Sequence, residues 1–223
     1  MLQTKILSIN RKTQIPSPTT KAQYGLTITE LRSLIPRRTR ISVATAMQVA
    51  EQQADALVWR HKLSGSPLLP IPATVITEIK RLLVIETDQE IPGVSMWDRH
   101  SGRFEIQLAR TDIAAQRFTL ACEFKHILDY DNVDRLYRGS PTECPASLAD
   151  RAADYFAACL LVPTELLKQA WRNGVHTTKE LARLFVVSES LIRERLDQAG
   201  LSITNESGER RHLLSGLPVG VAA

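Results

Sequence analysis

Cys122, Glu123 and His126 lie in the segment Cys-Glu-Phe-Lys-His, whose residue types and spacing suit metal chemistry. Residues four apart share one face of a helix, so Cys122 and His126 can reach the same ion. When both positions are His, the pair binds zinc, and the Glu beside the first ligand is the general base that activates a metal-bound water. The alternative is a chance match, because Cys is a residue type that is often simply buried.

Two carboxylates follow on the next predicted helix. Asp150 and Asp154 are four residues apart and therefore share a face. Where one helix supplies two zinc ligands, a carboxylate from a following helix commonly supplies the third. A further carboxylate can orient a ligating His by accepting its other ring N–H. The alternative for both Asp residues is an ordinary solvated helix face.

Capping residues and hydrophobic spacing predict the elements that position these side chains. Apolar residues lie all round the helix that carries the motif, which is typical of a buried helix. Helices are predicted at 27–36, 42–58, 74–80, from just after Thr111 or Asp112 to 129, at 147–161 and at 164–171, and a helical unit is predicted at 177–200. Strands are predicted at 82–85, 94–97 and 104–108, and a loop at 130–145. We therefore expect an α+β fold, mostly helical, with a small β-hairpin sheet against the motif helix.

Two blocks of sequence in this order resemble the ImmA/IrrE family of metallo-endopeptidases. They read RFTLACEFKHILD at 117–129 and ADYFAACLLVP at 153–163. The resemblance extends over about residues 29–201 and implies a zincin-like domain. It implies Glu123 as catalytic base, a metal site of Cys122, His126 and Asp150, and Asp154 in support of the ligands.

Two of the three implied ligands depart from the family pattern, which has His at position 122 and Glu at position 150. Each replacement shortens the reach to the metal by roughly 1.5 Å at ordinary bond lengths. A thiolate with one His and one carboxylate also leaves a zinc site near neutral, which lowers the pKa of bound water less than a cationic site does. We therefore expect substoichiometric zinc and weak peptidase activity, and we expect Cys122→His to raise zinc occupancy.

The resemblance implies a regulatory protein that cleaves a helix-turn-helix transcriptional repressor, often in a stress response or on a mobile element. The predicted hairpin could offer an edge strand to an extended substrate. Tyr130 and Tyr155 are candidates to stabilise the oxyanion. The alternative is a catalytically inactive relative that keeps the fold and binds a repressor or DNA. Glu123 favours the enzyme, and the missing His at position 122 favours the alternative.

The segment 177–200 resembles a helix-turn-helix pair, with Ser188 capping its second helix. If the pair bound DNA, the second helix would face the major groove and Arg193 and Arg195 would contact it. Nearby Glu side chains oppose this role, because phosphates repel carboxylates. The alternative is a helical pair that packs on the protease-like domain.

Bulk composition sets the remaining expectations. The chain has 223 residues, a net charge of +4, three cysteines, and no apolar run long enough to span a membrane. A cytoplasmic protein without disulfides is expected. The predicted organisation is a disordered basic tail at 1–25, a metallopeptidase-like domain at 26–172, the helical pair at 173–201 and a flexible tail at 202–223.

Overall fold

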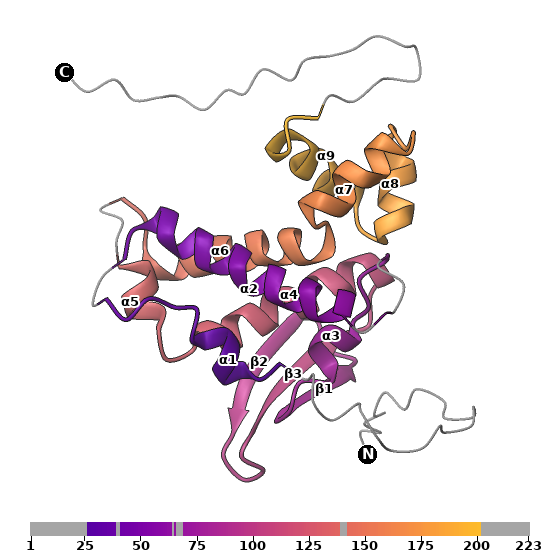
Figure 1. Ribbon diagram of the computed structural model, residues 1–223. Helices are drawn as coiled ribbons and strands as arrows, with labels where there is room; N and C mark the ends of the chain where they lie inside the picture. The colour runs from indigo at the N-terminus through magenta and orange to yellow at the C-terminus, as the bar shows by residue number, and fades with distance from the viewer. Residues whose placement is uncertain (1–25, 39–40, 64, 66–68, 139–141, 202–223) are drawn as a thin grey trace, which may run out of the picture.

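The computed structural model describes residues 26–38, 41–63, 65, 69–138 and 142–201. The predicted tails at 1–25 and 202–223 lie outside the described residues. Helices are stacked over one small sheet (Figure 1), which confirms the predicted α+β class. None of the described helices is both long enough and apolar enough to cross a bilayer.

The sheet contains the predicted hairpin and one further strand. Its strands are β1 (Leu82–Thr87), β2 (Gly93–Asp98) and β3 (Arg103–Ala109), in the order β1-β3-β2. β2 runs antiparallel to β3 with Trp97 opposite Phe104, whereas β1 is parallel to β3 with Leu82 opposite Phe104. Within the described sheet, β2 is therefore an edge strand.

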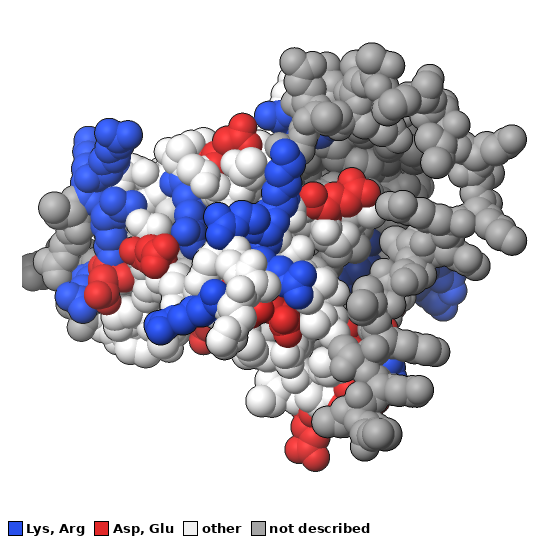
Figure 2. Space-filling model, turned by 90° about the horizontal axis from the view of Figure 1, so that it is seen from below, with Lys and Arg blue, Asp and Glu red and all other residues white. Residues whose placement is uncertain are grey.

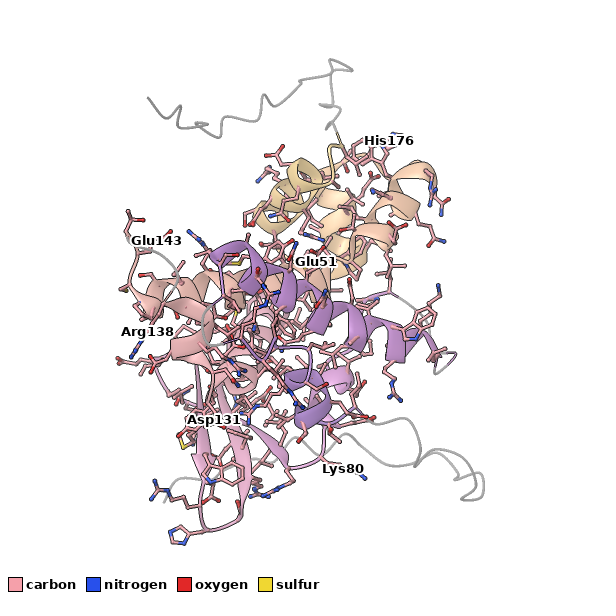
Figure 3. All side chains as sticks on the ribbon, turned by 60° about the vertical axis from the view of Figure 1, so that its left-hand side comes forward. Glu51, Lys80, Asp131, Arg138, Glu143 and His176 are labelled. Atoms are coloured by element: carbon pink, nitrogen blue, oxygen red, sulfur yellow. The ribbon has the colours of Figure 1, made fainter. Side chains whose placement is uncertain are left out.

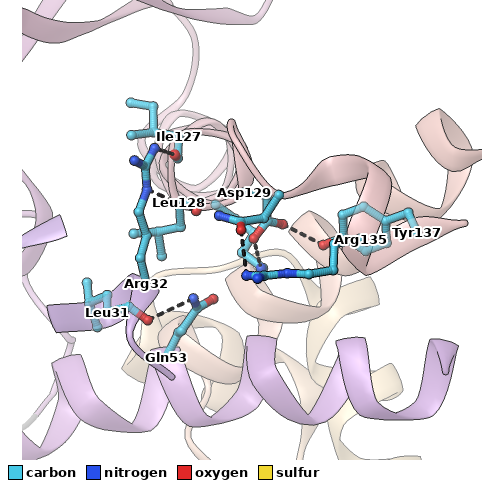
Figure 4. A network of polar contacts seen from close by, with 10 residues as sticks. Leu31, Arg32, Gln53, Ile127, Leu128, Asp129, Arg135 and Tyr137 are labelled. Atoms are coloured by element: carbon cyan, nitrogen blue, oxygen red, sulfur yellow. Dashed lines mark hydrogen bonds and ion pairs between the residues drawn. The ribbon is translucent and has the colours of Figure 1, made fainter. Parts of the chain in front are cut away.

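Helix α4 (Ile113–Asp129) carries the motif and lies between the sheet and the helices above it (Figure 1). Asp112 begins it by accepting hydrogen bonds from the backbone N–H groups of Ala114 and Ala115. Arg32, at the end of α1 (Ile28–Arg32), donates to the carbonyls of Ile127 and Leu128 near the other end of α4 (Figure 4). Both ends of the motif helix are thus held by polar contacts.

Helices α6 (Pro145–Leu161) and α2 (Val43–Leu63) form the layer above α4, with α6 packed on both. Cys144 caps α6 by accepting a hydrogen bond from the Ser147 backbone, and Pro145 takes the first helical position. The helix therefore begins two residues before the predicted start at Ser147. Short helix α3 (Thr74–Thr77) precedes β1.

The C-terminal helices are α7 (Thr164–Arg172), α8 (Thr178–Phe185) and α9 (Glu189–Gln198). They share a core of Leu167, Leu181, Phe185 and Ile192 with the end of α6. The predicted helix-turn-helix-like pair is α8 and α9, and its turn is made by Val186 at a φ of 54°. Because α7 packs in the same core, the predicted boundary at residue 173 stays a prediction.

The predicted loop at 130–145 was wrong in one respect, because it contains helix α5 (Val133–Tyr137). Buried polar contacts explain this helix. Lys125 is fully buried and lies 2.5 Å from Asp129, which also accepts a 2.5 Å hydrogen bond from the Tyr137 hydroxyl (Figure 4). The hydrogen bond from Tyr137 to Asp129 holds the end of α5 against the end of α4.

Candidate functional site

The motif helix and α6 bring the predicted site residues face to face. The Cys122 thiol donates to Asp154 with a sulfur–oxygen distance of 3.5 Å. One turn along α4, His126 Nε2 lies 3.6 Å from Asp150 Oδ1. Because residue numbers rise along α4 as they fall along α6, the two helices run antiparallel and the contacts form two parallel rungs.

The surroundings of Cys122 favour a protonated thiol. Burial raises the pKa of Cys122 most, and the nearby carboxylates of Asp154, Glu123 and Asp150 raise it further. The thiol is therefore a hydrogen-bond donor to Asp154. A zinc ligand must instead be a thiolate.

The rungs do not amount to a metal-binding group. In the described part of the chain, no three His, Cys, Asp or Glu side chains are gathered closely enough to hold one metal ion. Cys122 pairs with Asp154 and His126 with Asp150, so the predicted ligands Cys122, His126 and Asp150 share a surface without converging. Asp154, predicted to support a ligand, instead accepts the hydrogen bond of Cys122. As they lie, these side chains do not fit the zinc coordination that the motif predicts.

Glu123, the predicted catalytic base, packs against edge strand β2. A Cβ atom added to Gly93 would lie 3.0 Å from Glu123 Cγ and 2.5 Å from Thr119 Cγ2. The backbone of β2 can approach α4 this closely because Gly93 has no side chain. The close contact fixes the distance between the strand and the half-buried Glu123.

Gly93→Ala is expected to lower the free energy of unfolding by about 1–3 kcal/mol, because overpacking forces α4 and β2 apart. Urea denaturation measures the loss. Adding Thr119→Ala removes the nearest clashing atom, so the double variant should recover part of it. A Gly93→Ala protein as stable as the wild type would contradict this packing.

The two oxyanion candidates lie apart from the rungs. Tyr155 hydrogen-bonds through its hydroxyl to Glu51 Oε2 on α2 at 3.3 Å, so it serves the contact between α6 and α2. Tyr130 is 59% exposed, and its ring packs edge-on against Phe104 at 6.0 Å. Neither contact gives support to an oxyanion role.

The candidate DNA-binding residues are both engaged within the protein. Arg193 forms a 2.9 Å ion pair with Glu189 one turn earlier on α9. Arg195 is only 3% exposed, and its Nε donates to the Val162 carbonyl at 3.1 Å. Arg195 therefore anchors α9 to the start of α7 and does not face a DNA phosphate.

Charge on the helical pair also disfavours DNA. It carries four basic and four acidic residues: Lys179, Arg183, Arg193 and Arg195 against Glu180, Glu189, Glu194 and Asp197. Basic side chains gather instead across the face seen from below, on the side of the hairpin (Figure 2), whereas α8 and α9 lie at the top of Figure 1. DNA binding by α9 would therefore lack the electrostatic attraction that dominates such affinities.

A small sheet with an edge strand against the motif helix, which is paired with a second helix that bears carboxylates, is consistent with a zincin-like domain. Residues 104–197 match the family described as the IrrE N-terminal-like domain, so this part of the chain is similar to that family. The match confirms the resemblance seen in the two sequence blocks. No protein among those with curated descriptions matches the chain.

A solved structure shares the fold. It is a Mycobacterium tuberculosis transcriptional regulator, aligned with a TM-score of 0.51 and 16% sequence identity over 83% of this chain. At that identity the likeness concerns the fold alone. The aligned part covers 58% of the regulator, so this chain corresponds to little more than half of that protein.

Proposed function

We propose that this protein regulates transcription by binding a segment of a partner regulator, without zinc-dependent hydrolysis of it. The metallopeptidase-family domain and the structural likeness to a transcriptional regulator support the regulatory role. The observation that carries the proposal is the pairing of Cys122 with Asp154 and of His126 with Asp150. These contacts use the side chains that would otherwise hold zinc.

The proposed binding surface is the free edge of β2. An extended peptide can add to an exposed sheet edge through main-chain hydrogen bonds, with side-chain pockets supplying specificity. Gly93 on this strand lies directly over Glu123, so a peptide along β2 would pass close to the α4–α6 rungs. A cytoplasmic helix-turn-helix repressor is the partner that the family resemblance implies.

A second candidate function is residual metal-dependent hydrolysis. Glu123 supports this function, because its half-buried side chain packs against Gly93 of the edge strand, along which an extended peptide would lie. Cys122, His126 and Asp150 would hold zinc only if their present pairs separated, and zinc would then supply an activated water. Glu123 would be the general base of such a site.

Replacing Glu123 with Gln separates the two functions. The variant keeps the shape of the side chain and removes the base, so hydrolysis should fall by a factor of at least about 100. The partner to test is the transcriptional regulator encoded beside this gene. Binding of that partner and its effect on a reporter promoter should equal those of the wild type, and the partner should remain intact by mass spectrometry.

The matched control is Glu105→Gln, which removes a carboxylate from β3 and leaves the helix pair unchanged. The hydrolytic function would be supported, and the binding function contradicted, by three results together. The wild type cleaves the partner, Glu123→Gln loses both cleavage and regulation, and Glu105→Gln retains both.

A further inference from the structure

A second concave surface lies on the other side of α6 from the rungs. It is a cleft of about 710 Å³ between the second half of α2 and the C-terminal helices α7 and α9. Its volume is within the range of about 300–1,000 Å³ that is usual for small-molecule sites. Glu51 on α2 lies beside the C-terminal helices at this cleft (Figure 3). No residue of the rungs lines it.

One end of the cleft is acidic. Glu51 and Asp55 are one turn apart on α2, and both line the cleft. Burial raises the pKa of Asp55 most, the charge of Glu51 raises it further, and Arg195 lowers it. Glu51 is half-buried and Asp55 is exposed, and their like charges repel each other, so a cation between them would be bound favourably.

The guanidinium of Arg195, which acts on the charge of Asp55, already forms hydrogen bonds within the protein. Arg195 lines the cleft at 3% exposure, but it donates to the Val162 carbonyl at 3.1 Å, to Gln198 at 2.6 Å and to Thr164 at 2.8 Å. Among the described residues, no ion pair joins Glu51 or Asp55 to a basic side chain. Two carboxylates beside one guanidinium leave this end with a net negative charge.

An exposed aromatic ring follows on the same face of α2. Trp59 is one turn beyond Asp55 and 57% exposed, and Lys62 Nζ lies 5.7 Å from the centre of its ring. Lys62 shows that the ring accepts a cation over its face, and its 57% exposure leaves room for a flat group to pack on it. Val58 and Leu166 provide apolar lining between the walls.

We propose that this cleft binds a small organic cation with a flat apolar body. The ammonium group is held by Glu51 and Asp55, and the body packs on Trp59 and Leu166. The spacing suits such a molecule, because one helical turn, about 5.4 Å, separates the acidic pair from the ring along α2. The bound molecule would bridge α2 to the C-terminal helices and so serve as an effector. This site does not depend on how the α4–α6 rungs function.

Basic side chains that line the cleft favour the opposite kind of ligand. Lys62 and Arg172 also line the cleft, and they would attract an anionic ligand instead. Glu165 lies on the same wall as Arg172 and offsets part of its charge. The sign of the ligand's charge is therefore the property to test.

Three probes of nearly the same shape differ in that charge: tryptamine is a cation, tryptophol is neutral and indole-3-propionate is an anion. Isothermal titration of the full chain should show saturable binding of tryptamine. Tryptophol should bind roughly 10- to 100-fold more weakly, the factor expected for loss of a charge-assisted hydrogen bond. Indole-3-propionate should bind no better than tryptophol.

Glu51→Gln with Asp55→Asn should weaken tryptamine binding by a similar factor and leave tryptophol unchanged. Glu194→Gln, which removes an exposed acid of α9 outside the cleft lining, is the control and should have no effect. Circular dichroism confirms that each variant is folded. The proposal is overturned if the anion binds best, if the double variant binds tryptamine normally, or if none of the three probes binds saturably. Glu123→Gln should bind tryptamine like the wild type. A negative result for tryptamine binding would therefore contradict the cleft proposal without contradicting the regulatory proposal.

Discussion

Replacement of Asp129 by Asn is expected to lower the free energy of unfolding by about 3–5 kcal/mol, the range observed when one partner of a buried ion pair is removed. Lys125 and Asp129 have side-chain exposures of 0% and 2%, so the remaining ammonium group would stay in the core without a counter-charge. The hydroxyl of Tyr137 would lose its charged acceptor at the same time. Thermal and urea unfolding measure the loss, which corresponds to a fall in Tm on the order of 10 °C.

An exposed ion pair with the same sequence spacing provides the control. Asp134 and Arg138 are four residues apart on and just after α5, and their side chains are 72% and 61% exposed. Asp134→Asn should cost less than about 1 kcal/mol, because solvent screens such pairs. Equal losses in the two variants would show that the Lys125–Asp129 pair does not anchor α4. A double variant, Lys125→Met with Asp129→Leu, should be less destabilised than Asp129→Asn, because it leaves no buried charge.

The second large effect is expected from rebuilding the ligand set. Cys122→His with Asp150→Glu restores the side-chain types and lengths that the family pattern has at these two positions. The variant should bind about one zinc ion per chain, because two His and one carboxylate form a complete set of protein ligands. Cys122→His alone should raise zinc content to an intermediate level, since Asp150 remains too short.

Removal of another thiol is the control for the rebuilt site. Cys144 is exposed at the start of α6, and Cys144→Ser should not change zinc content. Peptidase activity should accompany zinc only in the double variant, and Glu123→Gln in that background should abolish it. A double variant that stays free of zinc would show that the helix pair, and not the ligand side chains, limits binding.

Much of the fold follows from local sequence. Thr27, Asp112, Thr177 and Ser188 were each predicted to start a helix, and each side chain accepts a hydrogen bond from the first turn. The hairpin was predicted from two apolar runs around a polar turn at Gly102, which has a φ of 61°. These features depend on interactions within a few residues, which is why the sequence alone is enough to predict them.

Features that depend on tertiary contacts were not predictable in the same way. A lysine in a helix that is apolar all round needs a polar partner. For Lys125 that partner is Asp129 in the next turn, which is itself held by Tyr137 of α5. The parallel pairing of β1 with β3 and the cleft beside Asp55 likewise arise only when distant segments pack. For the site, the sequence placed Cys122, His126, Asp150 and Asp154 on facing helices, but not their pairing into two rungs.

The most direct test is the zinc content of the wild-type protein, purified without chelator and measured by elemental analysis after incubation with zinc and removal of the excess. We predict a zinc content well below one ion per chain, with partner binding and regulation intact, because Cys122 is paired with Asp154 and His126 with Asp150. One tightly held zinc per wild-type chain, together with loss of regulation in Glu123→Gln, would contradict the account.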